Sequence, residues 1–374
     1  MFHFNIYLDI LFENTYGKYM HSKSLHTPSR KYLFFISQDY SFPVLRPLQD
    51  AIIGRGDEVT WFMYGHEIHK EYILENESTL SSVEEIIEYQ PDAVFVPGNV
   101  VPSFIPGLKV EVFHGLPSSK AKKNGQLYHY IIRGMFDLYC TQGASSTKIF
   151  SQLAKKYGYF NTIETGWGKL DPLFSDSIPK EKNTTKNIFF ASTFSPRFSK
   201  AKALYPYILK MMKTHDYHWY ITLHPKMDKE IVLLYQSIDL KNVTFVDSTE
   251  VIPYMKKCDI MLCDTSSIMY EFLTQHKPVV TFQTEKELPY LINVTQIELL
   301  EETLINTMKH KDAYQDIIHE GIQEIHPYTD GKSSQRVLNA VEQMLNDTVM
   351  PKKKKPLNFI RNLKLRKALN YWKF

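Results

Sequence analysis

At 374 residues the chain is longer than one hydrophobic core usually supports, so we expect two domains. Apolar residues make up 43% and charged residues 23%, which is typical of a soluble globular protein. The three cysteines form no CxxC pair, which argues against a disulfide framework and against structural zinc, and no run of about 18 apolar residues predicts a membrane-spanning helix.

Residues 1–12 are apolar, but they include Asp9 and no basic residue precedes them, so they resemble a signal peptide poorly. We expect residues 1–30 to form an N-terminal extension docked on the protein. The next residues, 31–38, are a short Phe-rich apolar run and predict the first buried strand.

A strand–helix alternation continues from there. In the first half we expect further strands over 58–64, 93–96, 109–113 and 138–141, and helices over 43–55, over 81–89 and from residue 145. This spacing is typical of right-handed crossovers, so it predicts a parallel sheet with helices on its faces.

The same alternation restarts after residues 175–186, a polar stretch with Pro179 that has the composition of a linker. Strands are expected over 187–191, 218–223, 243–246, 260–263 and 279–282. Two such halves predict an α/β protein of two Rossmann-like domains that face a cleft. We place the first domain at 31–174, the second at 175–347, and a C-terminal tail at 348–374.

His114 directly follows the strand predicted at 109–113. Ligands of open α/β sheets bind beyond the carboxyl ends of the strands, where a histidine is well placed for proton transfer. The alternative is that His114 and Gly115 only form a turn.

His224 follows the strand predicted at 218–223, and Pro225 suits the first turn of a helix whose free amides can bind an anion. The alternative is an exposed histidine beside a helix cap. Because His114 and His224 end strands of the two halves, we expect them to face each other across the cleft.

The residues after the strand at 260–263 combine Asp264, Ser266 and Ser267 at the start of a helix predicted over 268–275. Hydroxyl groups and free amides together suit a phosphate, although ordinary N-capping is common. Glu271, one turn on, is placed to accept hydrogen bonds from ribose hydroxyls; its alternative is a solvated carboxylate. For residues 330–334 a capped helix start is the favoured interpretation.

In this order the motifs resemble the CDP-glycerol glycerophosphotransferases of teichoic acid and capsule synthesis. The similar segments are 113–117 (FHGLP), 166–171 (GWGKLD), 190–194 (FASTF), 223–225 (LHP), 263–271 (CDTSSIMYE), 277–278 (KP) and 330–332 (DGK). The resemblance implies the GT-B fold, with an acceptor domain at 31–174 and a donor domain at 175–347. This chain departs from the family's pattern at Thr265, Glu271 and 168–169, which leaves ribitol phosphate or a nucleotide sugar open as the donor chemistry.

The resemblance implies that an acceptor hydroxyl attacks the β-phosphorus of CDP-glycerol and releases CMP. His114 is then the general base, because the attacking hydroxyl must lose its proton. His224, Ser266 and Ser267 are expected to bind the diphosphate and the charge that develops on it, so His224 is a second catalytic residue, and Glu271 is expected to bind the ribose. Asp264 is also assigned to the donor site. Additional phosphate contacts are expected from Thr193 and Lys169. We expect no metal site and no cofactor.

Two other functions stay open from the sequence. One is a metal-independent GT-B glycosyltransferase that uses a nucleotide sugar. The other is a non-catalytic nucleotide-sugar-binding or membrane-adaptor protein with a decayed site, against which the retained histidines and serines speak. The expected acceptor is a cell-surface glycan or a lipid-linked molecule.

The charge is distributed unevenly. The chain has 44 basic and 41 acidic residues, but nine of the basic residues and no acidic residue lie in 352–374, which leaves 35 against 41 in the body. We therefore expect no nucleic-acid partner. Lys352–Lys355 followed by scattered large apolar residues predicts contact of residues 351–374 with an anionic membrane, on the cytoplasmic face of a bacterial cell. The alternatives are a solvated disordered tail, a final helix packed across both domains and, for the tail alone, binding to nucleic acid.

Overall fold

The fold was obtained as a computed structural model that describes residues 29–65, 68–117, 125, 127–175, 185–285, 287–346 and 351–373. The chain divides into two compact units, Met1–Arg30 and Lys31–Phe374. Nearly all of the predicted N-terminal extension, and residues 176–184 of the predicted linker, lie outside the described residues. Everything below concerns the second unit.

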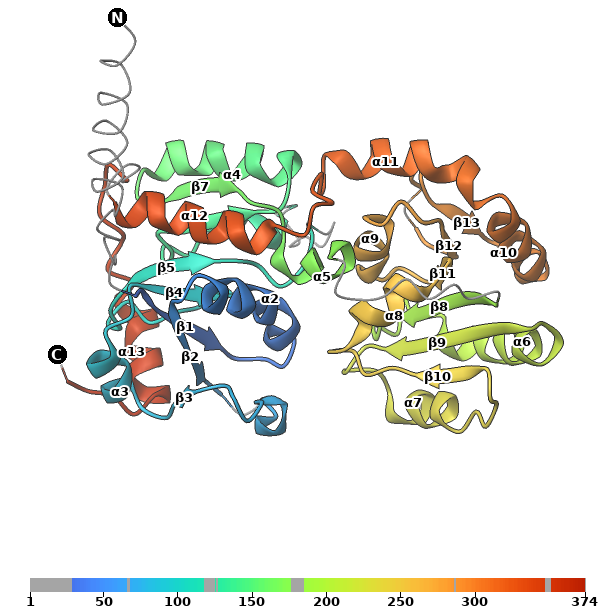
Figure 1. The fold of residues 1–374 in the computed structure, drawn as a ribbon, viewed down its shortest axis with the longest axis horizontal. Coiled ribbons are helices and arrows are strands. Elements are labelled where there is room, and N and C mark those ends of the chain that lie inside the picture. Colours follow the sequence, from blue (N-terminus) through green and yellow to red (C-terminus); the bar gives the residue numbers. More distant parts are fainter. Residues whose placement is uncertain are drawn as a thin grey trace, which may run out of the picture. The chain divides into compact units, whose positions relative to one another are not determined.

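The N-terminal half contains a seven-stranded parallel sheet in the order β3-β2-β1-β4-β5-β6-β7 (Figure 1). The strands are β1 Lys31–Ile36, β2 Glu58–Met63, β3 Thr79–Leu80, β4 Ala93–Val96, β5 Leu108–Glu111, β6 Leu138–Thr141 and β7 Asn161–Glu164. Its helices are α2 Ser41–Gly54, α3 Val83–Tyr89, α4 Ala144–Tyr157 and α5 Asp171–Phe174, with 3₁₀ turns η1 Lys70–Tyr72, η2 Tyr128–Tyr130 and η3 Gly168–Leu170.

The C-terminal half contains a six-stranded parallel sheet in the order β10-β9-β8-β11-β12-β13. The strands are β8 Lys186–Ser192, β9 Tyr217–Leu223, β10 Val243–Phe245, β11 Ile260–Cys263, β12 Val279–Phe282 and β13 Ile292–Val294. The helices are α6 Ala201–Thr214, α7 Lys229–Gln236, α8 Val251–Lys257, α9 Ile268–Leu273, α10 Leu300–Lys309 and α11 Gln315–Gln323, with 3₁₀ turns η4 Ile297–Leu299 and η5 Lys311–Tyr314.

Both faces of the N-terminal sheet are buried, as the alternation along β1 shows. Tyr32, Phe34 and Ile36 pack in the cluster that includes residues of α2. Leu33 and Phe35 pack in the cluster that includes residues of α3 and α4. Because side chains alternate along a strand, a parallel strand buried on both faces is apolar at every position, and this is why the continuous run at 31–38 predicts it.

Two C-terminal helices return to the N-terminal sheet. The helix α12 (Ser333–Leu345) packs against α2, β5 and β6 (Figure 1), although the sequence boundary at 347 assigns it to the second domain. Its apolar stripe, Val337, Leu338 and Val341, joins the cluster around α2. Helical periodicity predicts such a stripe but not the sheet that covers it.

The helix α13 (Phe359–Ala368) lies on the other face. Residues 97–107, between β4 and β5, contain no helix, so this part of the face lacks the cover that a crossover helix usually gives. Leu365 and Tyr371 of the tail bury their side chains there with Val101 and Ile105. The tail is thus folded, and among the described residues its apolar side chains pack on the N-terminal half rather than across both halves.

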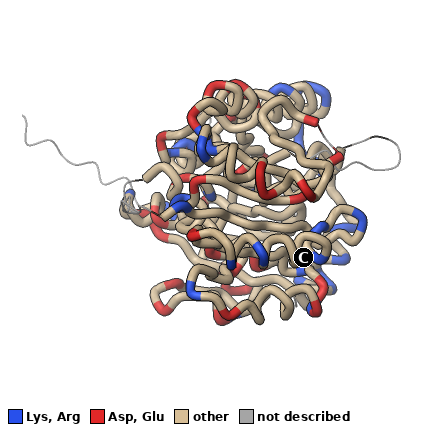
Figure 2. Tube along the Cα trace, turned by 90° about the vertical axis from the view of Figure 1, so that its right-hand side faces the viewer, with Lys and Arg blue, Asp and Glu red and all other residues tan. Residues whose placement is uncertain are grey.

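The two halves share contacts inside this unit. The short helix α5 packs against α8, and Leu173 lies in one apolar cluster with Val251 and Met255 of α8. The Tyr72 hydroxyl donates to Asp247 Oδ2 over 3.3 Å. Basic and acidic residues are interspersed along the trace (Figure 2), so the run of basic residues at 352–355 is exceptional. Among the described helices none is both long and apolar enough to cross a bilayer.

Candidate active site

The turn that carries His114 is strained and defined by hydrogen bonds. Phe113, a buried aromatic residue, has φ of 58°, a left-handed conformation that costs about 1–3 kcal/mol for such a residue. His114 is exposed, and its Nδ1 lies 3.1 Å from the carbonyl oxygen of Pro97. A carbonyl only accepts, so Nδ1 carries the proton and Nε2 is the basic nitrogen of the neutral ring.

His224 has the opposite tautomer. Its Nδ1 accepts the backbone N–H of Lys226 over 3.0 Å, so the proton of the neutral ring is on Nε2. The ring is exposed and lies 4.2 Å from the ring of Phe194, centroid to centroid. His114 is therefore arranged to accept a proton through Nε2, and His224 to donate a hydrogen bond through Nε2.

The two histidines do not end equivalent strands. His114 follows β5, which is the second strand from β1 on the side of β4. His224 follows β9, which is next to β8 on the side away from β11. Here β1 and β8 are the first strands of their sheets in chain order. The two histidines thus end strands at different lateral positions of their sheets, which the sequence could not show because the order of strands depends on the path of each crossover.

Asp264 shapes the loop that follows β8. Its carboxylate accepts the backbone N–H of Thr193 over 2.9 Å and of Lys200 over 3.0 Å, and the hydroxyl of Ser192. Burial raises the pKa of Asp264, while these hydrogen bonds act in the opposite direction. The carboxylate thereby fixes Thr193 at the carboxyl end of β8. Direct contacts of either residue with a donor stay predictions.

Ser266 and Ser267 lie between β11 and α9. Ser267 is the N-cap residue of α9 without a side-chain capping bond, and it is exposed, whereas Ser266 is half-buried. The helix ends at Leu273, two residues earlier than predicted, and has only six residues. A phosphate role thus depends on the hydroxyl groups and the local amides more than on a long helix dipole, and it stays a prediction.

Lys169 and Glu271 meet across the two halves. Lys169 Nζ lies 2.7 Å from Glu271 Oε2, and the two side chains are only 12% and 9% exposed. The contact is an ion pair without the angle of a hydrogen bond. The Lys169 ammonium also lies 5.1 Å from the centroid of the Trp167 ring. The structure thus brings together two residues that the sequence assigns separately to the donor site.

Comparisons with known proteins show the family of the chain. The sequence profile of the CDP-glycerol:poly(glycerophosphate) glycerophosphotransferases matches residues 135–343, more than half of the chain. The chain belongs to this family. It is therefore a transferase similar to the CDP-glycerol glycerophosphotransferases. No curated protein matches the sequence.

Similar solved structures establish the fold as GT-B. A variant of the wall teichoic acid polymerase TagF soaked with CDPG has a TM-score of 0.61 at 14% identity, with 90% of this chain and 94% of that chain covered. S. aureus MnaA with UDP has a TM-score of 0.58 at 15% identity, covering 88% and 100%. The UDP-GlcNAc 2-epimerase of Neisseria meningitidis with UDP-GlcNAc has 0.52 at 17%, covering 84% and 100%. The predicted GT-B arrangement is confirmed.

Two other segments that resemble the family's motifs have structural roles. Asp171 caps α12, since its Oδ1 accepts the N–H of Ser333 over 2.8 Å and its Oδ2 that of Ser334 over 2.7 Å. The capped helix start expected at 330–334 is confirmed, although the cap comes from 162 residues away. Burial raises the pKa of Asp171.

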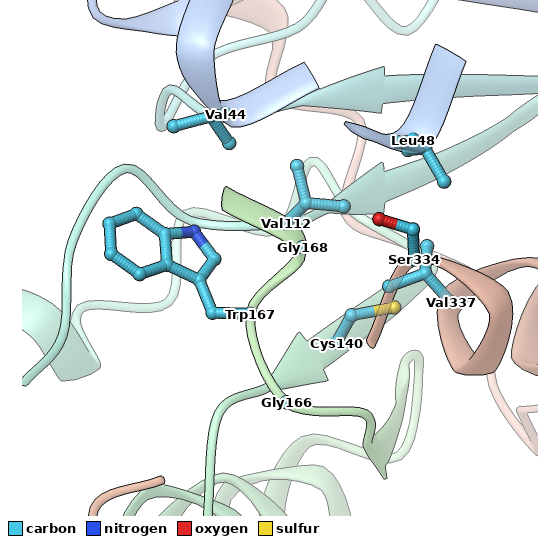
Figure 3. Close-up of a pocket in the computed structure, with 9 residues that line it drawn as sticks. All are labelled: Val44, Leu48, Val112, Cys140, Gly166, Trp167, Gly168, Ser334 and Val337. Atoms are coloured by element: carbon cyan, nitrogen blue, oxygen red, sulfur yellow. The ribbon is translucent and has the colours of Figure 1, made fainter. Parts of the chain in front are cut away.

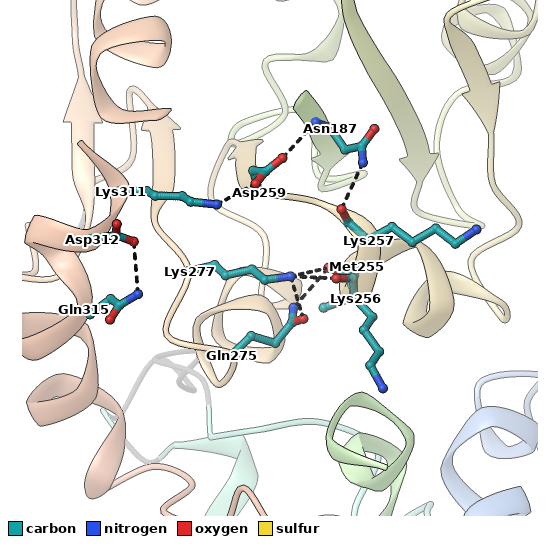
Figure 4. Close-up of polar contacts among 10 residues, drawn as sticks. All are labelled: Asn187, Met255, Lys256, Lys257, Asp259, Gln275, Lys277, Lys311, Asp312 and Gln315. Carbon is teal, nitrogen blue, oxygen red and sulfur yellow. Dashed lines mark hydrogen bonds and ion pairs between the residues drawn. The ribbon is translucent and has the colours of Figure 1, made fainter. Parts of the chain in front are cut away.

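Lys277 caps the carboxyl end of the helix α8 (Figure 4). Its ammonium donates to the carbonyl of Lys256 over 2.7 Å and to Gln275 Oε1 over 3.1 Å, at the carboxyl end of α8. Burial lowers the pKa of Lys277 to about 8. Beside it, Lys311 pairs with Asp259 over 2.7 Å. This network holds the amino ends of β11 and β12, away from the histidines.

His129 is a neighbour of the site that the sequence does not indicate. Its ring stacks on Phe113 with 4.8 Å between centroids. Burial, and then the nearby His114, lower the pKa of His129 to about 4, so it stays neutral. The local sequence LYHY has no motif that could have revealed it. Among the described residues no group of three or more His, Cys, Asp or Glu is placed to hold a metal ion; metal-independent chemistry stays a prediction.

Proposed function

We propose that the protein transfers glycerol phosphate, or a related polyol phosphate, from CDP-glycerol or a related CDP-polyol to a hydroxyl of a cell-surface glycan or lipid-linked acceptor. Membership of the family supports the donor class. The observation that carries the proposal is the pair of opposite histidine tautomers, because this transfer requires one proton acceptor and one hydrogen-bond donor to phosphate.

In the proposed reaction the acceptor hydroxyl gives its proton to His114 Nε2. Its oxygen forms a bond to the β-phosphorus of the donor, and the bond from that phosphorus to the bridging oxygen breaks. The bridging oxygen leaves with CMP, and the acceptor keeps the glycerol phosphate. His224 Nε2–H, Ser266 and Ser267 donate to the phosphate oxygens, where negative charge develops.

The Lys169–Glu271 pair indicates how the donor enters. Without a donor each group neutralises the other in a nearly buried position. Ribose hydroxyls that donate to Glu271 would replace the ammonium as its partner. Lys169 would then be available to a donor phosphate. The donor thus supplies both groups with partners that compensate their burial.

A nucleotide sugar is the second candidate donor. The departures at Thr265 and Glu271 favour it, since Thr265 adjoins the proposed phosphate contacts and Glu271 is the proposed ribose contact. MnaA, whose fold this chain shares, was solved with UDP. The chemistry would then be glycosyl transfer with a nucleoside diphosphate as the leaving group.

A donor screen tests the proposal. Purified full-length protein is incubated with CDP-glycerol, CDP-ribitol or UDP-sugars and with candidate glycan and lipid-linked acceptors, and products are identified by mass spectrometry. We expect CMP release and an acceptor mass increase of one or more glycerol phosphate units. Release of UDP from a sugar donor, with none of CMP, would replace the proposal by the second candidate. Donor binding without transfer to any acceptor would favour the non-catalytic alternative.

We also propose that the protein works in the cytoplasm at the inner face of the bacterial membrane, through the outer surface of its tail. Four large apolar side chains are exposed there: Leu357 by 88%, Phe359 by 68%, Ile360 by 70% and Trp372 by 51%. The same segment also carries exposed basic residues, namely Lys352, Lys353, Lys354, Arg361, Lys364, Lys367 and Lys373. Apolar groups flanked by lysines suit the interface of an anionic bilayer, where each basic residue contributes about 1 kcal/mol.

The tail is anchored, so this surface is held in a fixed place. Lys355 pairs with Asp137 over 2.7 Å, and the Asn358 amide donates to the carbonyl of Gly134 over 2.8 Å. Deleting the tail would therefore uncover the apolar face that Leu365 and Tyr371 fill. The outer surface must be tested by substitution instead.

A vesicle experiment separates membrane contact from folding. The triple variant with Leu357, Phe359 and Ile360 replaced by Ser should lose co-sedimentation with phosphatidylcholine vesicles that contain phosphatidylglycerol, while its thermal unfolding stays unchanged. The control replaces Ile53 and Leu233, which are exposed by 56% and 64% elsewhere, by Ser. Undiminished vesicle binding by the triple variant would exclude the tail as the contact surface.

A further inference from the structure

We propose that Trp167 is a positioning residue for His114, because its indole N–H fixes the strained peptide that presents the histidine. Trp167 Nε1 donates to the carbonyl oxygen of Phe113 over 3.2 Å. The indole N–H binds the peptide of Phe113 rather than a substrate, so its effect on His114 would pass through the turn, while its ring faces the Lys169 ammonium at 5.1 Å. The catalytic consequence rests on the proposed function.

The turn needs external support. Phe113 has the left-handed φ of 58°, which a bulky aromatic residue adopts only where its surroundings impose it. A hydrogen bond on the Phe113 carbonyl restrains the peptide that links it to His114. Without that bond the peptide can relax toward an ordinary conformation, and the imidazole would move with it.

Hydrogen bonds between described residues support the turn on both sides of His114. The indole of Trp167 holds the residue before His114, and Gln142 Nε2 holds the residue after it, at the Gly115 carbonyl, over 3.0 Å. His114 Nδ1 is held by Pro97. Trp167 is 1% exposed and Gln142 is fully buried, so water does not compete for these bonds. The bond to Pro97 sets the tautomer, and the two flanking bonds set the direction of the ring.

Trp167 is itself held firmly. Its backbone N–H donates to Nε2 of the buried His326 over 3.1 Å. Figure 3 shows the indole beside the cavity lined by Gly166 and Gly168, whose volume of about 10 Å³ leaves room for at most about one water. A side chain at Gly168 would come within 2.6 Å of Ser334 Oγ. The indole therefore has little freedom to move away from Phe113.

Two other buried tryptophans provide matched controls. Trp61, in the N-terminal half, donates its indole N–H to Gln49 Oε1 over 2.7 Å. The Trp219 indole N–H, in the C-terminal half, has no hydrogen-bond partner among the described residues. Replacing each by Phe removes the same volume from a core. Only Trp167→Phe also removes a hydrogen bond from the His114 turn.

The first test is kinetic. Trp167→Phe should lower kcat with CDP-glycerol by roughly ten- to a hundredfold, the range for small displacements of a reacting group, with KM changed less than about twofold. Benzothienylalanine at position 167 keeps the two fused rings, has sulfur in place of N–H, and should have the same effect if Trp167→Phe folds poorly. An equal loss of kcat in Trp61→Phe, or wild-type kcat with benzothienylalanine, would overturn the proposal.

The second test does not need turnover. Nitrogen-15 NMR of the full chain, with the His114 signals assigned through His114→Gln, reports the tautomer and titration midpoint of the ring. We expect the Nδ1–H tautomer in the wild type, and a mixture of tautomers with a shifted midpoint after either change at Trp167. Unchanged His114 signals would refute the positioning role. If the wild type transfers no glycerol phosphate, the proposed function fails, and this measurement still decides the role of Trp167.

Discussion

The two halves of the molecule each end a parallel strand with an exposed histidine, yet the two rings are prepared for opposite tasks. The Nδ1 of His114 meets a carbonyl, and the Nδ1 of His224 meets a backbone N–H. The distal nitrogen is therefore a proton acceptor in one half and a donor in the other. The position at a strand end brings a histidine to a ligand, whereas its hydrogen-bond partner decides what the ring does there.

The largest effect should follow from removing the proposed base. His114→Ala should lower turnover by roughly 10²–10⁴-fold, the usual contribution of general acid–base catalysis. CMP release measures turnover, and calorimetry with CDP should give an affinity close to that of the wild type. Wild-type turnover in this variant would reduce His114 to a turn residue.

The His224 variants should behave differently, because His224 is expected to donate a hydrogen bond to the donor phosphate. His224→Ala should weaken binding of CDP-glycerol roughly ten- to a hundredfold, the loss expected for a hydrogen bond to a charged group. His224→Gln, whose amide can still donate, should recover much of this affinity. If Ala and Gln variants bind equally well, the donor tautomer has no role in binding.

Glu271 connects the two halves through Lys169 and provides a third test. Glu271→Gln should weaken binding of CDP-glycerol roughly tenfold and should reduce the preference for ribose over deoxyribose. The double variant that adds Lys169→Met should lose less binding free energy for CDP than the two single variants lose together, because the two groups contact each other. Calorimetry with CDP and dCDP measures the affinity and the ribose preference of each variant. Additive losses of binding free energy would mean that Lys169 and Glu271 are not coupled.

The two serines should give smaller effects, since each offers one neutral hydroxyl. Ser266→Ala and Ser267→Ala should each weaken CDP binding by roughly two- to tenfold. Thr249→Ala, on a hydroxyl that donates to Asp247 within its own loop, is the control. Unchanged CDP affinity in both serine variants would move the phosphate contacts to another part of the C-terminal half.

A separate prediction concerns stability rather than binding or turnover, and the half-buried neighbour of His114, His129. The pKa of His129 is about 4 in the folded protein and about 6.5 in an unfolded chain, so the unfolded state binds more protons between these values. Above pH 6.5 the ring is neutral in both states and does not lower the free energy of unfolding. As the pH falls from 6.5 toward 4, proton binding to the unfolded state lowers the free energy of unfolding by about 1.4 kcal/mol per pH unit. His326, also with a pKa of about 4, adds to the slope.

Denaturant unfolding between pH 7.5 and pH 4.5 measures this dependence. His129→Gln should flatten the decline relative to the wild type, whereas His310→Gln, at an exposed position, should leave it unchanged. An equally steep decline in the His129 variant would show that this ring does not become charged on unfolding.

The sequence by itself determined the inner strands, because a strand buried on both faces must be apolar throughout. All ten predicted strands lie within two residues of the observed bounds, namely β1, β2, β4, β5, β6, β8, β9, β10, β11 and β12. The missed strands β3, β7 and β13 are all at sheet edges, where only β10, with the apolar sequence VTF, was predicted. Edge strands such as β7, with the sequence NTIE, are half-buried and carry polar residues, so no apolar run identifies them.

The sequence also determined which residue types follow the strands, and hence the family. Tertiary structure alone decided how they are used. A local pattern holds no information on the distant groups that complete a site: the carbonyl of Pro97 that sets the His114 tautomer, the carboxylate of Asp171 that caps α12, and the indole of Trp167 that holds Phe113. The tail likewise became a packed helix because the sheet face beneath it lacked a cover. Each of these contacts joins segments that only the folded chain brings together.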